Sequence, residues 1–123
     1  MGLSSALLSD ILGKVFVANN TIRLTNASGS YIGESYKIQS GDFSVSSGQA
    51  SSARNMMIYL CEKTGGDGTA TGFAVLNGTN VYYTGEFSTP MTIGYNTVPT
   101  IKKYDASKGE GILVTMTSTD VSG

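Results

Sequence analysis

Residues 72–87, GFAVLNGTNVYYTGEF, constrain the fold of this chain more than any other segment. Two runs of apolar and aromatic residues, typical of strands, flank the pair Asn77-Gly78. Asn and Gly tolerate the positive φ angles that tight hairpin turns require, so this pair is a strong turn signal. The sequence therefore predicts a β-hairpin, whose connection is either the four residues 77–80 or a shorter, bulged turn.

The outgoing strand of this hairpin has one apolar face. Side chains alternate along a strand, so Val81, Tyr83 and Phe87 share the face that we expect to point into the core. Tyr82 lies on the other face, and it is the tyrosine of this strand that we consider for a role at the surface. Pro90 lacks the N–H that a central strand needs, and we expect the strand to end there.

The chain after position 20 continues as short apolar runs separated by Gly, Asn and Ser. We expect loops at 46–54 and 63–72, and strands at 21–25, 31–38, 42–46, 55–60, 72–76, 81–87, 97–104 and 111–117. The absence of helical patterns between these runs favours antiparallel pairing. The predicted fold is mainly β: an antiparallel β-sandwich or barrel-like domain of about eight short strands with one N-terminal amphipathic helix. We expect a single domain over residues 1–123, with the helix and a linker at 1–19 and the strands at 20–123.

The N-terminal segment is the one part of the chain with helical periodicity. A serine at position 4 or 5 can cap this helix. The apolar face can form a lid on the chain's own sheet, or an arm that packs on a neighbouring subunit. We favour the lid, because one apolar face needs only one surface to bury against. The residues of this face recur at three- and four-residue steps: Leu8, Ile11, Leu12 and Val15.

Composition argues against several classes of function. The chain has 8 basic and 9 acidic residues, a net charge of −1 and no histidine. It therefore offers no positive stripe for nucleic acid, and no histidine for a zinc site or a nucleophilic triad. Cys61, the only cysteine, lies in an apolar run and is expected to be buried and inert. We expect no cofactor, no metal ion, no membrane span and synthesis in the cytoplasm.

Two weaker chemical hypotheses involve acidic residues. Glu86 and Glu110 could form a catalytic carboxylate pair, and the segment 65–68, GGDG, could offer oxygen ligands to calcium. Scattered acidic residues often lie near one another by chance, and one acid in a glycine-rich turn is usually only part of the turn. The sequence therefore indicates a protein that is not an enzyme.

The order of these features resembles short virion proteins of tailed bacteriophages, a family often labelled phage tail fibre or structural proteins. The resemblance begins with LSSALLSDILGKVF at 3–16 and continues through ESYKI at 34–38. It is greatest in GFAVLNGTNVYYTGEFSTPMTI at 72–93, and GILVTM at 111–116 is similar to the family's closing strand. The resemblance covers most of the chain and implies no catalytic residues.

The resemblance implies a non-enzymatic structural protein of the virion, made in the host cytoplasm, whose partners are the major capsid protein or other virion proteins. We expect it to decorate or cement the capsid, because the chain has no coiled-coil stalk or repetitive shaft with which to form a fibre. One alternative is a tail or fibre component involved in host attachment. The other is a small carbohydrate- or peptide-binding β-sandwich.

We expect a homo-oligomer, and the symmetry of virion parts suggests a trimer. The chain has 7 tyrosines and 5 methionines, residue types that are common at interfaces. The candidate residues for a partner interface come from the apolar face of the helix, if it acts as an arm, and from two tyrosines: Leu8, Leu12, Tyr82 and Tyr95.

Overall fold

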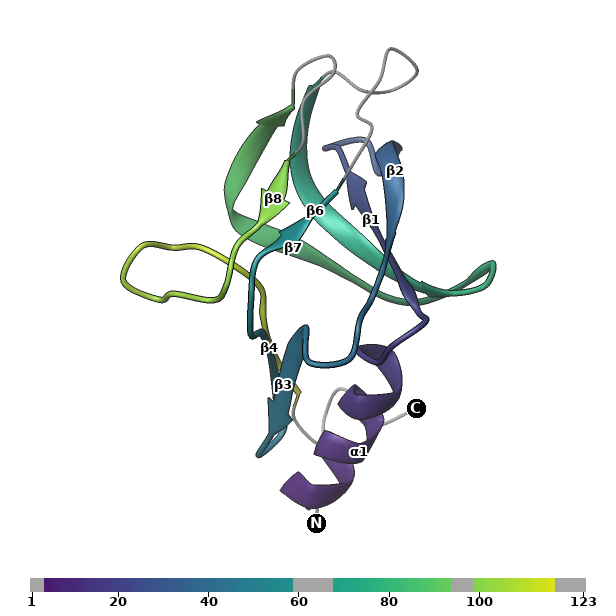
Figure 1. The fold of residues 1–123 in the computed structure, drawn as a ribbon, viewed down its shortest axis with the longest axis vertical. Helices are drawn as coiled ribbons and strands as arrows, with labels where there is room; N and C mark the ends of the chain where they lie inside the picture. The colour runs from purple at the N-terminus through teal and green to yellow at the C-terminus, as the bar shows by residue number, and fades with distance from the viewer. Residues whose placement is uncertain (1–3, 59–67, 94–98, 117–123) are drawn as a thin grey trace.

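The computed structural model describes residues 4–58, 68–93 and 99–116. Within these ranges lie one helix and nine strands (Figure 1). No helix in this part of the chain is long and apolar enough to cross a membrane. In chain order the elements are α1 (Ser5–Val15), β1 (Thr21–Thr25), β2 (Tyr31–Lys37), β3 (Phe43–Ser46), β4 (Gln49–Ser52), β5 (Met56–Met57), β6 (Gly68–Asn77), β7 (Asn80–Ile93), β8 (Thr100–Ile101) and β9 (Leu113–Thr115).

The strands form three sheets. A four-stranded sheet has the order β2-β1-β6-β7, a three-stranded sheet has the order β3-β4-β9, and β5 pairs with β8. Every strand pairing is antiparallel. The prediction of a mainly β, antiparallel fold with one N-terminal helix is confirmed, although the described strands do not close into a barrel.

The predicted hairpin is the central part of a longer one, formed by β6 and β7. Asn77 pairs with Asn80, so Gly78 and Thr79 form a two-residue loop. Gly78 has a φ of 61°, the positive value that the first position of such a loop requires. The turn is therefore shorter than the four-residue connection that we considered.

Pro90 lies in an irregular part of β7. Gly72 pairs with Glu86, whereas Ala70 pairs with Met91, so five steps along β7 match two steps along β6. The extra residues form a bulge, in which a proline need not donate to the ladder. The prediction that the strand ends at Pro90 is therefore wrong, because β7 continues beyond it.

The segment at 46–54, predicted to be a loop, contains the strand β4. Its sequence QASS has no large apolar or β-branched residue, so it carries little strand signal. The strand forms because Ser47 and Gly48, with φ values of 51° and 74°, make a two-residue turn that returns the chain alongside β3. The loop prediction failed here because pairing with neighbouring strands overrides a weak local propensity.

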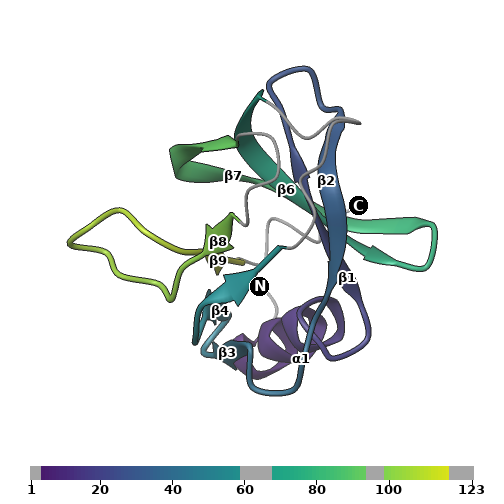
Figure 2. The ribbon, with the colours of Figure 1, turned by 45° about the horizontal axis from the view of Figure 1, so that its top comes forward.

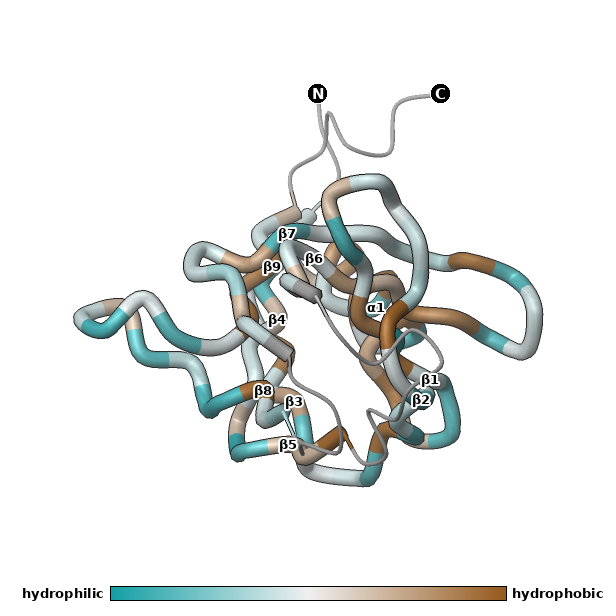
Figure 3. Tube along the Cα trace, turned by 90° about the horizontal axis from the view of Figure 1, so that it is seen from above, coloured by the Kyte–Doolittle hydropathy of each residue, from teal (hydrophilic) through white to brown (hydrophobic). Residues whose placement is uncertain are grey.

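A buried serine connects β4 to the two ends of a projecting loop. Ser52 is 2% exposed, and its hydroxyl donates to the Lys102 carbonyl at 2.8 Å and accepts from the Ile112 N–H at 3.0 Å. Between these two contacts the chain leaves the body as a loop over residues 102–111, which is mostly hydrophilic (Figures 1 and 3).

Other element boundaries also differ from those predicted. Among the described residues, the expected strands at 55–60 and 97–104 correspond to the two-residue strands β5 and β8, whereas positions 59–60 and 97–98 lie outside the described residues. The strand β6 begins at Gly68, inside the segment 63–72 that was expected to be a loop.

The helix α1 packs against the hairpin of β3 and β4 (Figures 1 and 2). Ser4 caps it by accepting a hydrogen bond from a backbone N–H of the first turn, and Ser9 Oγ accepts from the Gly48 N–H at 2.9 Å. Leu8 and Leu12 are both buried. The apolar face of the helix therefore covers the chain's own sheet, as the lid interpretation predicts.

The helix and the two larger sheets share one hydrophobic core. The four-stranded sheet contributes the inner faces of β1 and β6, and the three-stranded sheet contributes side chains from β4 and β9. Representative buried members are Leu12, Phe16, Ile22, Leu24, Ala50, Phe73, Val75 and Val114.

Candidate partner-binding surface

The four residues expected at a partner interface lie in different environments. Leu8 and Leu12 belong to the interior of the chain, with 6% and 3% of their surface exposed. Tyr95 lies outside the described residues. Tyr82 is 49% exposed, so it is the one of the four whose side chain the structure places at the surface.

A bulge in β7 accounts for the exposure of this part of the strand. Val75 pairs with Tyr83, whereas Leu76 pairs with Val81, so Tyr82 is an extra residue with no opposite position on β6. The strict alternation of faces is interrupted between Val81 and Tyr83. Val81 is 51% exposed, and the prediction that it points into the core is therefore wrong.

Tyr83 and Phe87 pack against the core, as predicted. The ring centroid of Phe73 lies 6.0 Å from that of Tyr83 and 5.3 Å from that of Phe87. Phe16, at the end of the helix, contacts Tyr83 edge-on with 5.8 Å between centroids. These contacts fix β7 against the core and hold the adjacent Tyr82 at the surface.

An uncharged groove, lined by both apolar and hydroxyl-bearing side chains, adjoins Tyr82 between α1, β7 and β9. It has a volume of about 380 Å³ and is named hereafter the α1–β7 groove. None of its described lining residues is charged. Ile11 also lines a neighbouring hollow on α1, together with Leu7, which is 43% exposed. Protein interfaces favour aromatic side chains and are depleted of charged residues at their centre. The lining residues are Ile11, Leu12, Val15, Tyr82, Tyr83, Val114, Thr115 and Met116.

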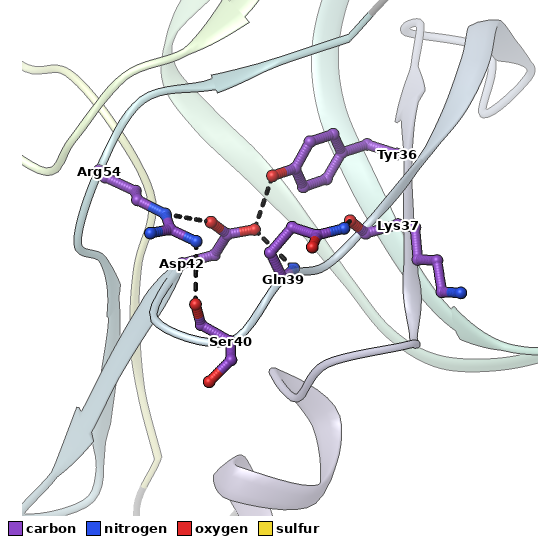
Figure 4. Close-up of polar contacts among 6 residues, drawn as sticks. All are labelled: Tyr36, Lys37, Gln39, Ser40, Asp42 and Arg54. Carbon is purple, nitrogen blue, oxygen red and sulfur yellow. Dashed lines mark hydrogen bonds and ion pairs between the residues drawn. The ribbon is translucent and has the colours of Figure 1, made fainter.

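A buried carboxylate lies in the connection between β2 and β3 (Figure 4). The side chain of Asp42 is 1% exposed. Its Oδ2 accepts hydrogen bonds from the Tyr36 hydroxyl at 2.6 Å and from the Gln39 N–H at 2.8 Å. Its Oδ1 accepts from Arg54 Nε at 2.5 Å, and Arg54 also donates to the Ser40 carbonyl. Both carboxylate oxygens are therefore bound by the chain itself.

Electrostatics keep this carboxylate ionised. Burial is the largest single influence and raises the pKa of Asp42, but the hydrogen bonds from Tyr36, Gln39 and Arg54 and the charge of Arg54 together outweigh it and hold the pKa below its usual value. Asp42 thus links the segment between β2 and β3 to the segment between β4 and β5, where Arg54 lies, and has a structural role. The sequence gives no signal for this pair, because Asp42 and Arg54 are 12 residues apart on different segments.

The chemical hypotheses based on acidic residues gain no support from the described part of the chain. It contains no group of three or more His, Cys, Asp or Glu side chains that could hold a metal ion. Glu86 lies on β7 opposite Gly72, whereas Glu110 lies on the projecting loop, 3.5 Å from the Lys102 ammonium. Cys61 and the acidic residue of the GGDG segment lie outside the described residues.

Comparisons of this chain with protein-family models, with curated protein sequences and with solved structures found no match.

Proposed function

We propose that this chain is a non-enzymatic structural protein of a tailed-bacteriophage virion, and that it decorates or cements the capsid. The resemblance of its motifs to short virion proteins supports the assignment to a virion. One structural observation supports a role in assembly: Tyr82, half exposed, stands beside the uncharged α1–β7 groove.

The physical argument rests on apolar burial. A partner segment in the groove removes Tyr82 and Ile11 from water, at a gain of about 25 cal/mol for each Å² of apolar surface covered. The core behind Tyr83 and Leu12 already holds the groove walls in place, so little ordering is required when a partner binds. In a symmetric particle the same contact recurs at every copy of the chain.

The proposal includes a homo-oligomer, with a trimer as the first expectation, and the major capsid protein or another virion protein as the partner. Light scattering on the purified chain measures the oligomeric state directly. A strict monomer at high concentration, unchanged when capsids are added, contradicts the oligomer. A location on the tail or on a fibre is the alternative, since the same groove can serve assembly at either place.

Cryo-electron microscopy of virions from the phage whose genome encodes the chain tests the location. We expect density for the chain in a regular array on the capsid. Density confined to the tail or to a fibre supports the alternative instead. Absence of the chain from purified particles overturns both.

A pair of tyrosine variants tests the surface. We expect Tyr82→Ala to lower the occupancy of particles by about tenfold or more, as loss of an aromatic anchor does, and to leave thermal stability nearly unchanged. Tyr31→Ala is the matched control, because Tyr31 is also exposed, at 39%, but lies on β2 and not at the groove. Equal occupancy for Tyr82→Ala and the unmodified chain contradicts a role for the groove.

A further inference from the structure

Four residues form one row across the outer face of the four-stranded sheet, which Figure 1 shows in its upper part. Tyr31 of β2 pairs with Thr25 of β1, Thr25 pairs with Gly72 of β6, and Gly72 pairs with Glu86 of β7. Directly opposed residues point to the same side of a sheet, and the neighbours Leu24 and Phe73 point into the core. The row therefore faces outward, with an aromatic residue at one end and a carboxylate at the other.

Gly72, in the middle of this row, is buried and carries no side chain. A Cβ on Gly72 would lie 2.4 Å from the Gly85 carbonyl oxygen and 3.1 Å from Thr25 Oγ1, so no larger residue fits without movement of the backbone. The row forms part of a shallow groove of about 690 Å³, whose far wall is the bulge of β7 that contains Pro90. Strands lie about 4.8 Å apart, so the two ends of the row are about 14 Å apart, enough for an extended ligand.

The aromatic end of the row is held in place before any ligand arrives. The Arg23 guanidinium lies over one face of the Tyr31 ring, 4.6 Å from its centroid, and Arg23 Nη2 donates to the Gly33 carbonyl at 2.7 Å. Arg23 Nε is buried without a hydrogen-bond partner among the described residues, which opposes folding. A tyrosine held in this way loses little conformational freedom when it binds a ligand.

The groups around the row define the ligand that it fits. Hydroxyls of Thr25, Thr84 and Ser88 and the carboxylate of Glu86 can exchange hydrogen bonds with a polar ligand. No lysine or arginine is among the described lining residues, and Glu86 is acidic, so the lining favours a neutral ligand over phosphate groups and other anions. An aromatic ring with hydroxyl and carboxylate groups on a shallow surface suits the apolar face and the hydroxyl groups of a sugar.

We propose that this outer-face groove binds a neutral oligosaccharide, with Tyr31 stacking on one sugar ring and Glu86 and Thr84 accepting hydrogen bonds from hydroxyl groups of the chain. The site is separate from the α1–β7 groove and needs no virion partner. Tyr82, the tyrosine of β7 that the sequence singled out for a role at the surface, lies at the other groove.

A printed array of neutral and acidic oligosaccharides, probed with the full chain, is the first experiment. We expect binding to neutral members of the array, and then chemical-shift changes in a ¹⁵N NMR titration with the best of them, at the amides of Thr25, Tyr31, Gly72 and Glu86. Tyr31→Ala should weaken binding about tenfold or more, while Tyr31→Phe should keep most of it, because the ring and not the hydroxyl makes the stacking contact. Tyr82→Ala is the matched control and should bind like the unmodified chain.

Each contrary result has a definite meaning. Binding to no oligosaccharide, or to acidic ones only, overturns the proposal, and so does neutral binding that Tyr31→Ala leaves unchanged in a variant whose NMR spectrum shows it to be folded. Loss of particle occupancy in Tyr31→Ala without any glycan binding identifies the face as a protein-docking surface and also overturns the proposal. If Tyr31→Ala does not fold, Tyr31→Phe and Glu86→Ala decide: the first should retain binding and the second should weaken it.

Discussion

Asp42 and Arg54 form an ion pair that is buried at one end only. The Asp42 side chain is 1% exposed and the Arg54 side chain 52% exposed, with 2.5 Å between Oδ1 and Nε. Arg54 can turn to water if the pair is lost. The Tyr36 hydroxyl and the Gln39 N–H, which donate to the same carboxylate, depend on Asp42 as their acceptor. The pair therefore matters to the fold mainly through its acid.

Replacing this acid should destabilise the protein. We expect Asp42→Ala to lower the free energy of unfolding by about 2 kcal/mol, because it leaves buried donors without an acceptor. Urea unfolding followed by circular dichroism measures the change. The control is Asp10→Ala at an exposed site on α1, which should change stability by less than about 0.5 kcal/mol. Equal effects of the two substitutions contradict a special role for Asp42.

The same carboxylate predicts how stability depends on pH. Because the pKa of Asp42 is lowered in the folded protein, its contribution is complete above the ordinary carboxyl pKa of about 3.9 and is lost as the pH falls toward the folded value. Melting temperatures should therefore decline less steeply through this acid range in Asp42→Asn than in the unmodified protein. Asp105, whose pKa is lowered chiefly by the Ser107 hydroxyl, remains in both and leaves a residual slope. If the melting temperatures of the two proteins fall equally steeply with decreasing pH in this range, the prediction is wrong.

The fold was predictable where local signals agree with tertiary pairing. Helical periodicity with a capping serine identified α1, and Asn77-Gly78 identified the hairpin of β6 and β7. The strand β4 was missed because its turn depends on a positive φ at Ser47, a conformation that serine seldom adopts. The prediction at Pro90 failed because the pairing of β6 and β7 forms a bulge there. In a bulge a proline does not cost the sheet a hydrogen bond.

The candidate surface was predictable in part: Leu12 and Tyr82, both expected at a partner interface, line the α1–β7 groove, although Leu12 is only 3% exposed. The alternation of β7 singled out Tyr82 as a surface tyrosine, and it is exposed. The α1–β7 groove could not be foreseen, because its walls come from α1, β7 and β9, which are far apart in the sequence. The cluster around Asp42 depends in the same way on a partner, Arg54, that local pattern does not connect to it.

The two faces of β7 should respond differently to substitution. Tyr83→Ala and Phe87→Ala should each lower the free energy of unfolding by about 2–3 kcal/mol, because both rings pack on Phe73. Tyr82→Ala should lower it by less than about 0.5 kcal/mol, because the ring is half exposed. Urea denaturation of the three variants tests the bulge directly. The reverse order, with Tyr82 the costly residue, shows that the register of β7 is shifted by one position.

The same substitution at two glycines should change stability in opposite directions. Gly13 lies inside α1, and a Cβ there has no heavy atom within 4 Å, so Gly13→Ala should stabilise the protein by about 0.5–1 kcal/mol through helix propensity. At Gly72 a Cβ would lie 2.4 Å from the Gly85 carbonyl oxygen, which is backbone and cannot turn away. Gly72→Ala should therefore destabilise by about 1–3 kcal/mol, as overpacking does. Urea midpoints at unchanged m-values measure both effects. If both variants shift in the same direction, either the helix is not formed at Gly13 or β6 and β7 do not approach closely at Gly72.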